Sequence, residues 1–253
     1  MITNLVSGSV VMNGVVQVVK KMAAFDADVL IHGETGTGKE LVAQYIHDHS
    51  DRKKGKFVAI NCCAIPDEML ESELFGHEAG AFTGANRRRI GKFEFADRGT
   101  LLLDEIDSMS VHMQAKLLRV LQERSLERLG SNESVPLDIR IIASTKKDLR
   151  KACIEGHFRE DLFYRLNVLN VYLPPLRERA DDILILFHFF LSLACLKHAA
   201  PVPLLTEELI EKLLSHSWPG NVRELRNIAD RFALGCELNI SEAEVEPPAA
   251  EIV

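Results

Sequence analysis

The residues that most constrain this chain are 33–40, Gly-Glu-Thr-Gly-Thr-Gly-Lys-Glu, which follow a short apolar run beginning at Val29. A buried strand that runs into a glycine-rich turn ending in Gly-Lys is typical of a phosphate-binding loop. Glycines let the backbone curl so that several N–H groups point at one anion, and the helix that follows adds its positive dipole end. The pattern predicts that a nucleoside triphosphate is bound by Gly33, Glu34, Thr35, Gly36, Thr37, Gly38, Lys39 and Glu40.

Composition argues against a nucleic-acid or membrane protein. The chain has 253 residues, is 47% hydrophobic and carries a net charge of −7. Binding to a phosphate backbone needs clustered Lys and Arg, and the basic run at 87–89 is best interpreted as a solvated loop flank. The longest apolar stretch, 183–196, is short for a membrane span. No signal peptide is evident, and the five cysteines lack metal-site spacing. We therefore expect a cytoplasmic protein.

Strand and helix patterns alternate over the first 174 residues. Short runs rich in branched apolar residues predict five buried strands, at 29–32, 57–61, 100–103, 140–143 and 168–173. Amphipathic helical patterns lie between them, for example at 40–49 and 111–123. Such alternation predicts an α/β fold with a mostly parallel sheet sandwiched by helices.

From residue 175 the pattern becomes purely helical. A helix is expected at 183–197, and Thr206 is placed to cap another. After the Pro219-Gly220 turn, Asn221 is expected to cap a last helix, with Glu224 at the capping-box position. We therefore expect an α/β nucleotide-binding part over 1–174 and a small all-helical part over 175–253, whose acidic end after Asn239 should be frayed.

Two carboxylates follow the third predicted strand. Asp104 and Glu105 should lie at the carboxyl edge of the sheet, where ligands bind in open α/β folds. Asp104 would hold Mg²⁺ through water, and Glu105 would polarise the attacking water as a general base. An ordinary acidic turn is the alternative, which the upstream phosphate loop disfavours. Glu40 stands where the loop consensus has Ser or Thr, and we expect it to point away from the nucleotide.

A third segment combines small residues with a single aromatic ring. It reads Gly80, Ala81, Phe82, Thr83, Gly84 and Ala85. Such a segment gains little by burial and is free to move, yet it offers Phe82 to a partner. From composition alone it is a flexible surface turn.

The hexapeptide at 80–85, behind Glu-Ser-Glu-Leu-Phe-Gly-His-Glu at 71–78, closely resembles the signature of bacterial enhancer-binding proteins, the AAA+ activators of sigma-54 RNA polymerase. Six further blocks, in the same order as in that family, carry the resemblance over nearly the whole chain: 33–40, 57–62, 99–106, 158–168, 174–179 and 218–225. The stretches His-Ser-Trp-Pro-Gly and Ala-Leu-Gly-Cys-Glu resemble the C4-dicarboxylate-type response regulators.

The resemblance implies roles that local patterns leave unassigned. Asn61 matches the switch residue that hydrogen-bonds the catalytic Glu105 and releases it as the γ-phosphate changes. Arg159 and Arg165 match the arginine fingers that reach into a neighbouring subunit's site, where a guanidinium stabilises charge on the transferred phosphoryl group. Arg223 matches the second sensor on a helical lid. Without the resemblance, all three arginines would be interpreted as surface charges.

The chain departs from the family pattern at the first sensor. Where the family often has Thr-Asn, this chain has Thr145-Lys146, so that a hydroxyl is kept and a neutral amide becomes a cation. That change puts the first sensor in doubt. Residues 130–138 correspond to the family's second mobile loop, thought to support the loop at 80–85.

The resemblance implies an ATP- and Mg²⁺-dependent ring ATPase, hexameric or heptameric, that contacts sigma-54 through 80–85 and remodels the polymerase closed complex. DNA binding would need a helix-turn-helix part that is not evident in this sequence, so we expect an isolated central domain. Two alternatives stay open: an AAA+ ATPase of another branch, such as a helicase loader or unfoldase, and a nucleotide-binding scaffold without hydrolysis. The 80–85 hexapeptide disfavours the first alternative, and the paired Asp104 and Glu105 disfavour the second.

Overall fold

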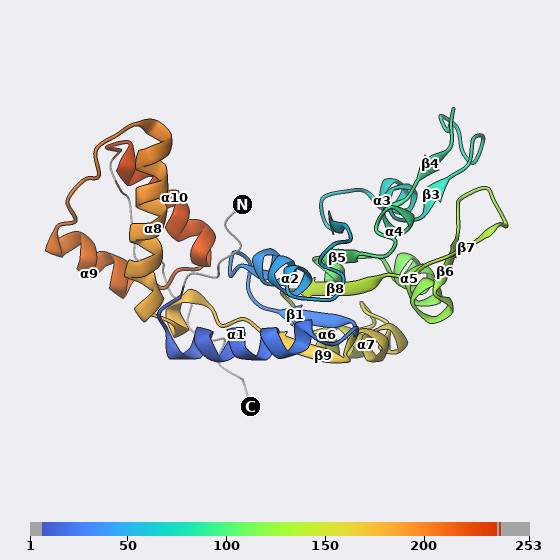
Figure 1. The fold of residues 1–253 in the computed structure, drawn as a ribbon, viewed down its shortest axis with the longest axis horizontal. Helices are drawn as coiled ribbons and strands as arrows, with labels where there is room; N and C mark the ends of the chain where they lie inside the picture. The colour runs from blue at the N-terminus through green and yellow to red at the C-terminus, as the bar shows by residue number, and fades with distance from the viewer. Residues whose placement is uncertain (1–6, 237, 239–253) are drawn as a thin grey trace. The chain divides into compact units, whose positions relative to one another are not determined.

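The computed structural model describes residues 7–236 and 238, drawn as a ribbon in Figure 1. The chain forms two compact units. The first contains Gly14–Glu34 and Gly38–Leu173. The second contains residues 7–13, Thr35–Thr37 and the described residues from Pro174 onward. The acidic end expected after Asn239 lies outside the described residues.

A five-stranded sheet forms the centre of the first unit. Its strands are β1 (Val29–His32), β2 (Phe57–Asn61), β5 (Thr100–Asp104), β8 (Arg140–Thr145) and β9 (Leu169–Tyr172). They lie in the order β2-β5-β8-β1-β9, and every neighbouring pair is parallel. The predicted parallel sheet is confirmed, with β5 and β8 extending beyond the predicted ends. Because the strands are parallel, their carboxyl ends meet at one edge, where Asn61 lies opposite Asp104.

Helices cover both faces of this sheet. The larger apolar core lies on the face that carries Leu30, Leu101 and Leu103, and it is closed by α3 (Asp67–Phe75), α5 (Val111–Glu123), α6 (Leu149–Ile154) and α7 (Glu160–Leu166). Successive strand residues point to opposite faces, and Ile31 and Leu102 on the other face are also fully buried. The first unit also contains α2 (Lys39–Asp48), the short α4 (Lys92–Phe95) and η1 (Ile106–Ser108). The helix α1 (Val10–Ala23) was not predicted.

Two small hairpins extend from the first unit, and neither was predicted. One pairs β3 (Gly76–His77) with β4 (Arg89–Ile90), and the other pairs β6 (Ser125–Glu127) with β7 (Ser134–Pro136). They lie side by side at one end of the unit (Figure 1), because the Leu129 N–H donates to Gly76 and the Leu129 carbonyl accepts from Glu78. The segments 80–85 and 130–133 are thus the tips of two joined hairpins.

The second unit is helical, as predicted. It contains η2 (Leu176–Glu178), α8 (Asp181–His198), α9 (Glu207–Ser215) and α10 (Asn221–Ala233). Trp218 is fully buried at its centre, and its indole N–H donates to the Leu213 carbonyl at 2.9 Å. The Thr206 cap is confirmed, since its side chain accepts from the Leu209 N–H. Among helices of the described residues, none combines the length and hydrophobicity that a membrane span needs.

The predicted cap of the last helix was wrong. Gly220 occupies the cap position, and its N–H donates to the Glu224 carboxylate at 2.8 Å. Asn221 instead adopts a left-handed backbone with φ of 52°, a conformation that Asn tolerates better than most residues. Its side-chain oxygen accepts from the Leu176 N–H at 2.7 Å. Asn221 is therefore the first residue of α10, and its side chain ties the helix to η2 rather than capping it.

Candidate active site

The loop between β1 and α2 has the backbone of a phosphate-binding turn. Gly36 and Gly38 have φ of 81° and 105°, values that glycine adopts without steric cost. At Gly36 a side chain is excluded, because a Cβ there would lie 2.2 Å from the Gly220 carbonyl oxygen. Lys39 begins α2, and its ammonium donates to the carbonyls of Gly33 at 2.8 Å and Glu34 at 3.1 Å. The helix N-terminus and the buried ammonium therefore lie at the same turn.

Segment Thr35–Thr37 is held by residues of the second unit. An Arg179 N–H donates to the Thr37 carbonyl at 3.0 Å, and the Asn221 amide donates to the Thr35 carbonyl at 3.1 Å. Arg179 is 4% exposed, and burial lowers its pKa. Arg223 lies beside the same segment, since a Cβ added to Gly36 would lie 3.1 Å from the Cβ of Arg223. The role of Arg179 was not predicted, although it lies in one of the family-like blocks, at 174–179.

Carboxylates set the electrostatics around Lys39. Burial lowers the pKa of the Lys39 ammonium, whereas Asp104, Glu105 and Asp107 raise it. Each of these three carboxylates follows or ends β5. The ammonium thus lies in the electrostatic field of an acidic strand end.

Asp104 is fixed by its neighbours on the adjacent strands. One carboxylate oxygen accepts from the Ser144 hydroxyl, and the other lies 3.4 Å from the Asn61 amide nitrogen. The Asn61 side-chain oxygen accepts from the N–H groups of Cys63 and Ala64, at 2.8 and 3.1 Å. The expected hydrogen bond from Asn61 to Glu105 is therefore not formed, because the register of β2 and β5 sets Asn61 opposite Asp104. Ser144 is a partner that the sequence analysis missed.

Glu105 lies in a constrained position just past the strand. Its φ of 54° is left-handed, which is uncommon for a residue other than glycine and clusters at functional sites. Its N–H lies 3.3 Å from the Ser144 hydroxyl, and its carboxylate lies 3.4 Å from the Lys146 ammonium. Thr145 is fully buried, and its hydroxyl lies 2.9 Å from Asp107 rather than at the Glu105 carboxylate. Lys146, a departure from the family pattern, thus faces the expected general base.

The expected arginine fingers lie in two different settings. Arg159 precedes α7, and its guanidinium pairs with Asp161 at 2.7 Å, both side chains being exposed. Arg165 points back to its own chain, where it donates to the Leu121 carbonyl at 2.9 Å and lies 3.9 Å from Asp28. Glu40 is exposed on the first turn of α2, as expected.

The segment 80–85 forms a closed turn at the tip of its hairpin. The Gly80 N–H donates to the Ala85 carbonyl at 2.8 Å, and Gly80 and Gly84 have φ of 83° and 101°. Phe82 is 46% exposed, and its ring meets His77 edge-on at 5.0 Å. Thr83 is exposed, whereas Ala85 is buried. The turn therefore presents an aromatic ring and a hydroxyl to solvent.

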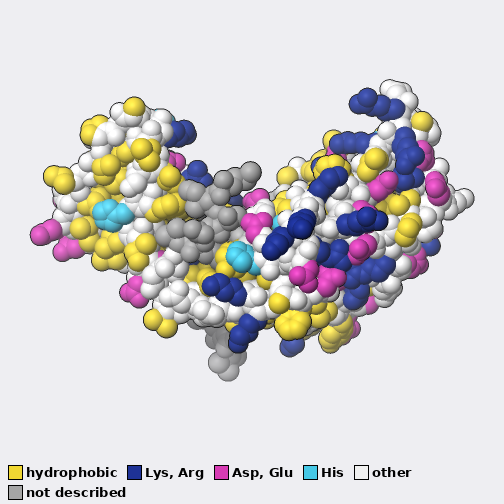
Figure 2. Space-filling model, viewed as in Figure 1, with side chains coloured by type: hydrophobic (Ala, Val, Ile, Leu, Met, Phe, Trp, Pro, Cys, Tyr) yellow, Lys and Arg dark blue, Asp and Glu magenta, His cyan; other side chains and the backbone are white. Residues whose placement is uncertain are grey.

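The basic run beside this turn is balanced by acidic residues. Arg88 pairs with Glu78 and Glu94 at 3.5 and 3.8 Å, and Arg89 pairs with Glu73 at 2.5 Å. Figure 2 shows basic and acidic side chains interspersed on the drawn face of the first unit, not a continuous basic surface. The interpretation of this run as a solvated flank is consistent with these pairs.

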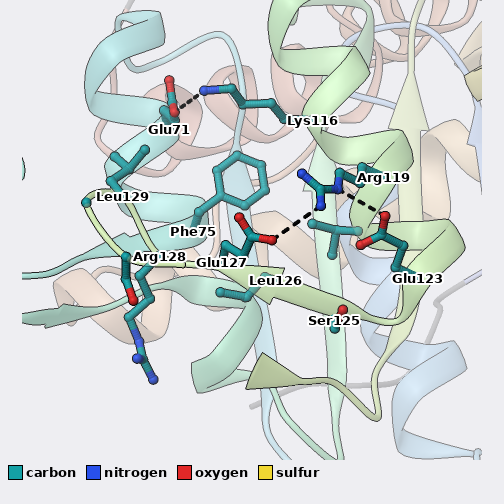
Figure 3. A pocket seen from close by; sticks show the side chains of 13 residues that line it. Glu71, Phe75, Lys116, Arg119, Glu123, Ser125, Leu126, Glu127, Arg128 and Leu129 are labelled. Atoms are coloured by element: carbon teal, nitrogen blue, oxygen red, sulfur yellow. Dashed lines mark hydrogen bonds and ion pairs between the residues drawn. The ribbon is translucent and has the colours of Figure 1, made fainter. Parts of the chain in front are cut away.

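A separate pocket of about 260 Å³ is lined by residues of α3, α5, β6 and the loop that follows β6. In Figure 3 the Phe75 ring lies between two charged clusters, Glu71 with Lys116 and Arg119 with Glu123 and Glu127. None of the residues that line it belongs to the predicted nucleotide site. Its charged side chains pair with one another, except Arg128, which pairs with Glu78 and Glu94 outside the pocket.

Comparison with known proteins decides the family. Residues 5–172 match the family described as the sigma-54 interaction domain, and residues 177–249 match the AAA+ ATPase lid domain. The chain belongs to the sigma-54-dependent transcriptional activators. Its fold is that of an AAA+ domain followed by a helical lid, in agreement with the parallel sheet and the helical second unit.

Individual activators align over most of this chain. It is 58% identical to the C4-dicarboxylate transport transcriptional regulatory protein DctD of Pseudomonas aeruginosa, over 92% of this chain and 50% of that protein. It is 48% identical to the Nif-specific regulatory protein of Klebsiella pneumoniae, over 96% of this chain and 46% of that protein. The chain thus spans about half the length of these curated relatives.

A solved activator structure has the same fold. The crystal structure of NtrX from Brucella abortus in complex with ADP superposes with a TM-score of 0.87 and 39% identity, over 92% of this chain and 52% of that one. NtrX has also been crystallised in complex with ATP, with a TM-score of 0.86, 39% identity, and coverage of 91% of this chain and 50% of that one. NtrX thus binds an adenine nucleotide in both of these structures.

Proposed function

We propose that this chain hydrolyses ATP at the carboxyl edge of its sheet. The observation that carries the proposal is the convergence there of the phosphate loop, the buried Lys39 and the carboxylates of Asp104 and Glu105. The loop N–H groups and Lys39 would hold the phosphates. Glu105 would take a proton from water as the water oxygen attacks the γ-phosphorus. The bond from that phosphorus to the β–γ bridging oxygen then breaks, leaving ADP and phosphate.

Mg²⁺ fits the residues that are present. The Asp104 carboxylate is fixed by Ser144 and Asn61 on the neighbouring strands, and carboxylate oxygen is the ligand type that Mg²⁺ prefers. In the described residues, no three His, Cys, Asp or Glu side chains gather to cage a metal. Asp104 would therefore hold the ion together with water and phosphate oxygens. When bound, the ion neutralises charge on the phosphates.

Residues away from the strand ends would complete the site. Arg159 is exposed and paired only with Asp161 within the described residues, so its guanidinium is available to a neighbouring subunit. Arg165 would have to leave Leu121 and Asp28 to act as a second finger. Fingers that act across an interface imply a closed ring of heterologous contacts, a hexamer or heptamer. Thr145 would support the first sensor through Asp107, and Arg223 would report the nucleotide state to the lid.

We further propose that the ring remodels the closed complex of sigma-54 RNA polymerase through the loop at 80–85. The exposed Phe82 and Thr83, on a glycine-bounded turn, support this contact. A loop that binds sigma-54 differently in the two nucleotide states would convert hydrolysis into movement. In this proposal 1–174 is the nucleotide-binding part, 175–253 is the lid, DNA contact comes from other parts of a longer activator, and the activity is cytoplasmic.

Substituting Glu105→Ala tests the hydrolysis. We expect phosphate release to fall by a factor on the order of 10² to 10⁴, because a positioned general base contributes that much. Binding of a fluorescent ATP analogue should stay within about twofold of wild type, since the phosphate loop is untouched. Normal hydrolysis by this variant would show that Glu105 is not the base. A wild-type chain that binds ATP but releases no phosphate would support the scaffold alternative.

Substituting Thr83→Ala tests the contact loop. We expect ATPase activity to remain near wild type, because the hairpin tip shares no hydrogen bond with the strand ends among the described residues. Capture of sigma-54 in the presence of a transition-state mimic of the γ-phosphate should be lost. The matched control is Ser131→Ala, at the tip of the neighbouring hairpin. Capture that survives in Thr83→Ala would refute the loop assignment.

A further inference from the structure

The cation that follows β8 has no role in the proposed reaction so far. The Lys146 ammonium lies 3.4 Å from Oε2 of Glu105. Among the described residues, Lys146 is the only side chain that pairs with the Glu105 carboxylate, since the other contacts of Glu105 are made by the Glu105 backbone. The two side chains are 37% and 17% exposed, so the pair is partly shielded from water.

The Asn61 side chain makes its hydrogen bonds to groups other than Glu105. Its amide nitrogen faces Asp104 at 3.4 Å, and its oxygen accepts from two backbone N–H groups of the turn at 63–64. Its hydrogen-bonding groups are thus engaged elsewhere. Among the described residues, the side chain that contacts the Glu105 carboxylate is that of Lys146.

We propose that Lys146 is a positioning residue that holds the Glu105 carboxylate and must release it before Glu105 accepts a proton from water. This inference rests on the proposed hydrolysis. A general base needs a free oxygen within hydrogen-bond reach of the water. While Oε2 accepts from Lys146, that oxygen is not free in this direction. The pair is a latch that delays the chemical step.

The surroundings of Lys146 allow its ammonium to move away from the Glu105 carboxylate. Its side chain lines a cleft of about 520 Å³, together with His32, Asp148 and Tyr172, so the ammonium has room to move. Lys146 is also among the charges that lower the pKa of Lys39. Phosphates brought to Lys39 therefore attract Lys146 as well. Nucleotide binding would draw the ammonium off Glu105, and a partly exposed ion pair costs little to break.

The kinetic test compares Lys146→Met, which removes the charge but keeps the stem, with Lys146→Arg, which keeps the charge. We expect kcat of Lys146→Met to rise roughly threefold, the size of a partly exposed ion pair. KM for ATP and the affinity for ADP should change less than about twofold. Lys146→Arg should stay at the wild-type rate. Lys151→Met, an exposed charge removed on α6, is the matched control and should also stay there.

A rise in kcat is informative because damage to the fold lowers activity. An unchanged or reduced kcat in Lys146→Met would overturn the latch, as would a Lys146→Arg variant that behaves like Lys146→Met. The Lys151→Met control shows the effect on kcat of replacing an exposed lysine by methionine away from Glu105. A rise in kcat that Lys146→Met shows and Lys151→Met lacks therefore comes from loss of the Lys146–Glu105 pair.

A second readout needs no hydrolysis. The experiment measures Tm of the protein without nucleotide. We expect Lys146→Met to lower Tm by about 1–3 °C when residue 105 is the wild-type glutamate. The same substitution should leave Tm unchanged when Glu105 has been replaced by glutamine. Equal shifts in both backgrounds would refute the pair. This coupling is independent of turnover. A wild-type chain that shows the coupling but releases no phosphate would refute the proposed function and not the pair.

Discussion

Arg140 places a guanidinium in the interior of the first unit, where it is 1% exposed. It donates to the carbonyls of Met22, Ala23 and Ala27, at 2.9, 3.3 and 2.9 Å, around the end of α1. Burial lowers the pKa of this guanidinium. A charge is tolerated here because helix-end carbonyls, which lack partners within their helix, accept its hydrogen bonds. Arg140 therefore attaches α1 to the sheet.

We expect Arg140→Met to lower the free energy of unfolding by about 2–4 kcal/mol, because buried carbonyls lose their donors. Chemical denaturation of the monomeric chain measures this loss. The matched control is Arg119→Met, whose side chain is 63% exposed and pairs with Glu123 and Glu127. That control should cost less than about 1 kcal/mol. Equal losses in the two variants would show that Arg140 does not attach α1.

At the residue scale, the sequence predicted which residues lie in the site better than it predicted which side chains they contact. The phosphate loop, Asp104 and Glu105 follow from spacing, because a strand end fixes where its last side chains lie. The structure sets Asn61 beside Asp104 rather than Glu105, because the side-chain partners depend on the register between β2 and β5, which sequence spacing does not define. Ser144 and Lys146 enter the site for the same reason, through the pairing of β8 beside β5.

At the scale of elements, the two hairpins share one buried charge. Arg128 is 5% exposed and donates to Glu94 at 2.9 and 3.0 Å and to Glu78 at 3.2 Å. Glu133, on the loop of the same hairpin as Arg128, lies 3.6 Å from its guanidinium. A Cβ on Gly130 would lie 2.8 Å from that of Ala81, so the tips touch directly. Arg128 thus ties the base of one loop to the other.

Substituting Arg128→Met should loosen both hairpins while the sheet stays folded. We expect hydrogen exchange to quicken by roughly tenfold or more at 76–90 and 125–136, because local opening loses a buried, multiply bonded charge. Exchange in β5 and β8 should not change. Arg119→Met, near the same pocket but exposed, serves as the control. Faster exchange throughout the first unit would mean that Arg128 stabilises the whole unit rather than the hairpins.

The elements themselves were predicted unevenly. Three central strands, β1, β5 and β8, are predictable because both their faces are buried, which makes each rich in apolar residues. The edge strands β2 and β9 are less buried but still carry branched apolar residues. The hairpin strands are only two or three residues long, too short to show a periodic pattern, and carry no such signal. The helix α1 begins with Val10 and Val11, which are 83% and 52% exposed, so its apolar pattern is weakened at the start.

At the scale of the whole molecule, the proposed ring makes each site depend on two chains. Within one chain Arg159 is exposed and pairs only with its near neighbour Asp161 among the described residues, whereas Glu105 lies at the strand end. Sequence spacing alone did not distinguish an arginine finger from a surface ion pair, because the nucleotide that a finger contacts would be bound by another chain. The role of Arg159 therefore has to be tested in the assembled oligomer.

Mixing two inactive variants tests this dependence. We expect Arg159→Ala to lose hydrolysis by a factor on the order of 10³ to 10⁵ if it serves as a finger. In a one-to-one mixture with Glu105→Ala, about a quarter of the interfaces would join an intact Glu105 to an intact Arg159, if subunits mix at random in a head-to-tail ring. Phosphate release should recover to about that share of the wild-type rate. Mixing Arg159→Ala with the Arg159→Ala, Glu105→Ala double variant offers no such interface and should stay inactive. Recovery in neither mixture, with exchange of subunits verified by mass, would place Arg159 in its own chain's site and remove the chemical reason for a ring.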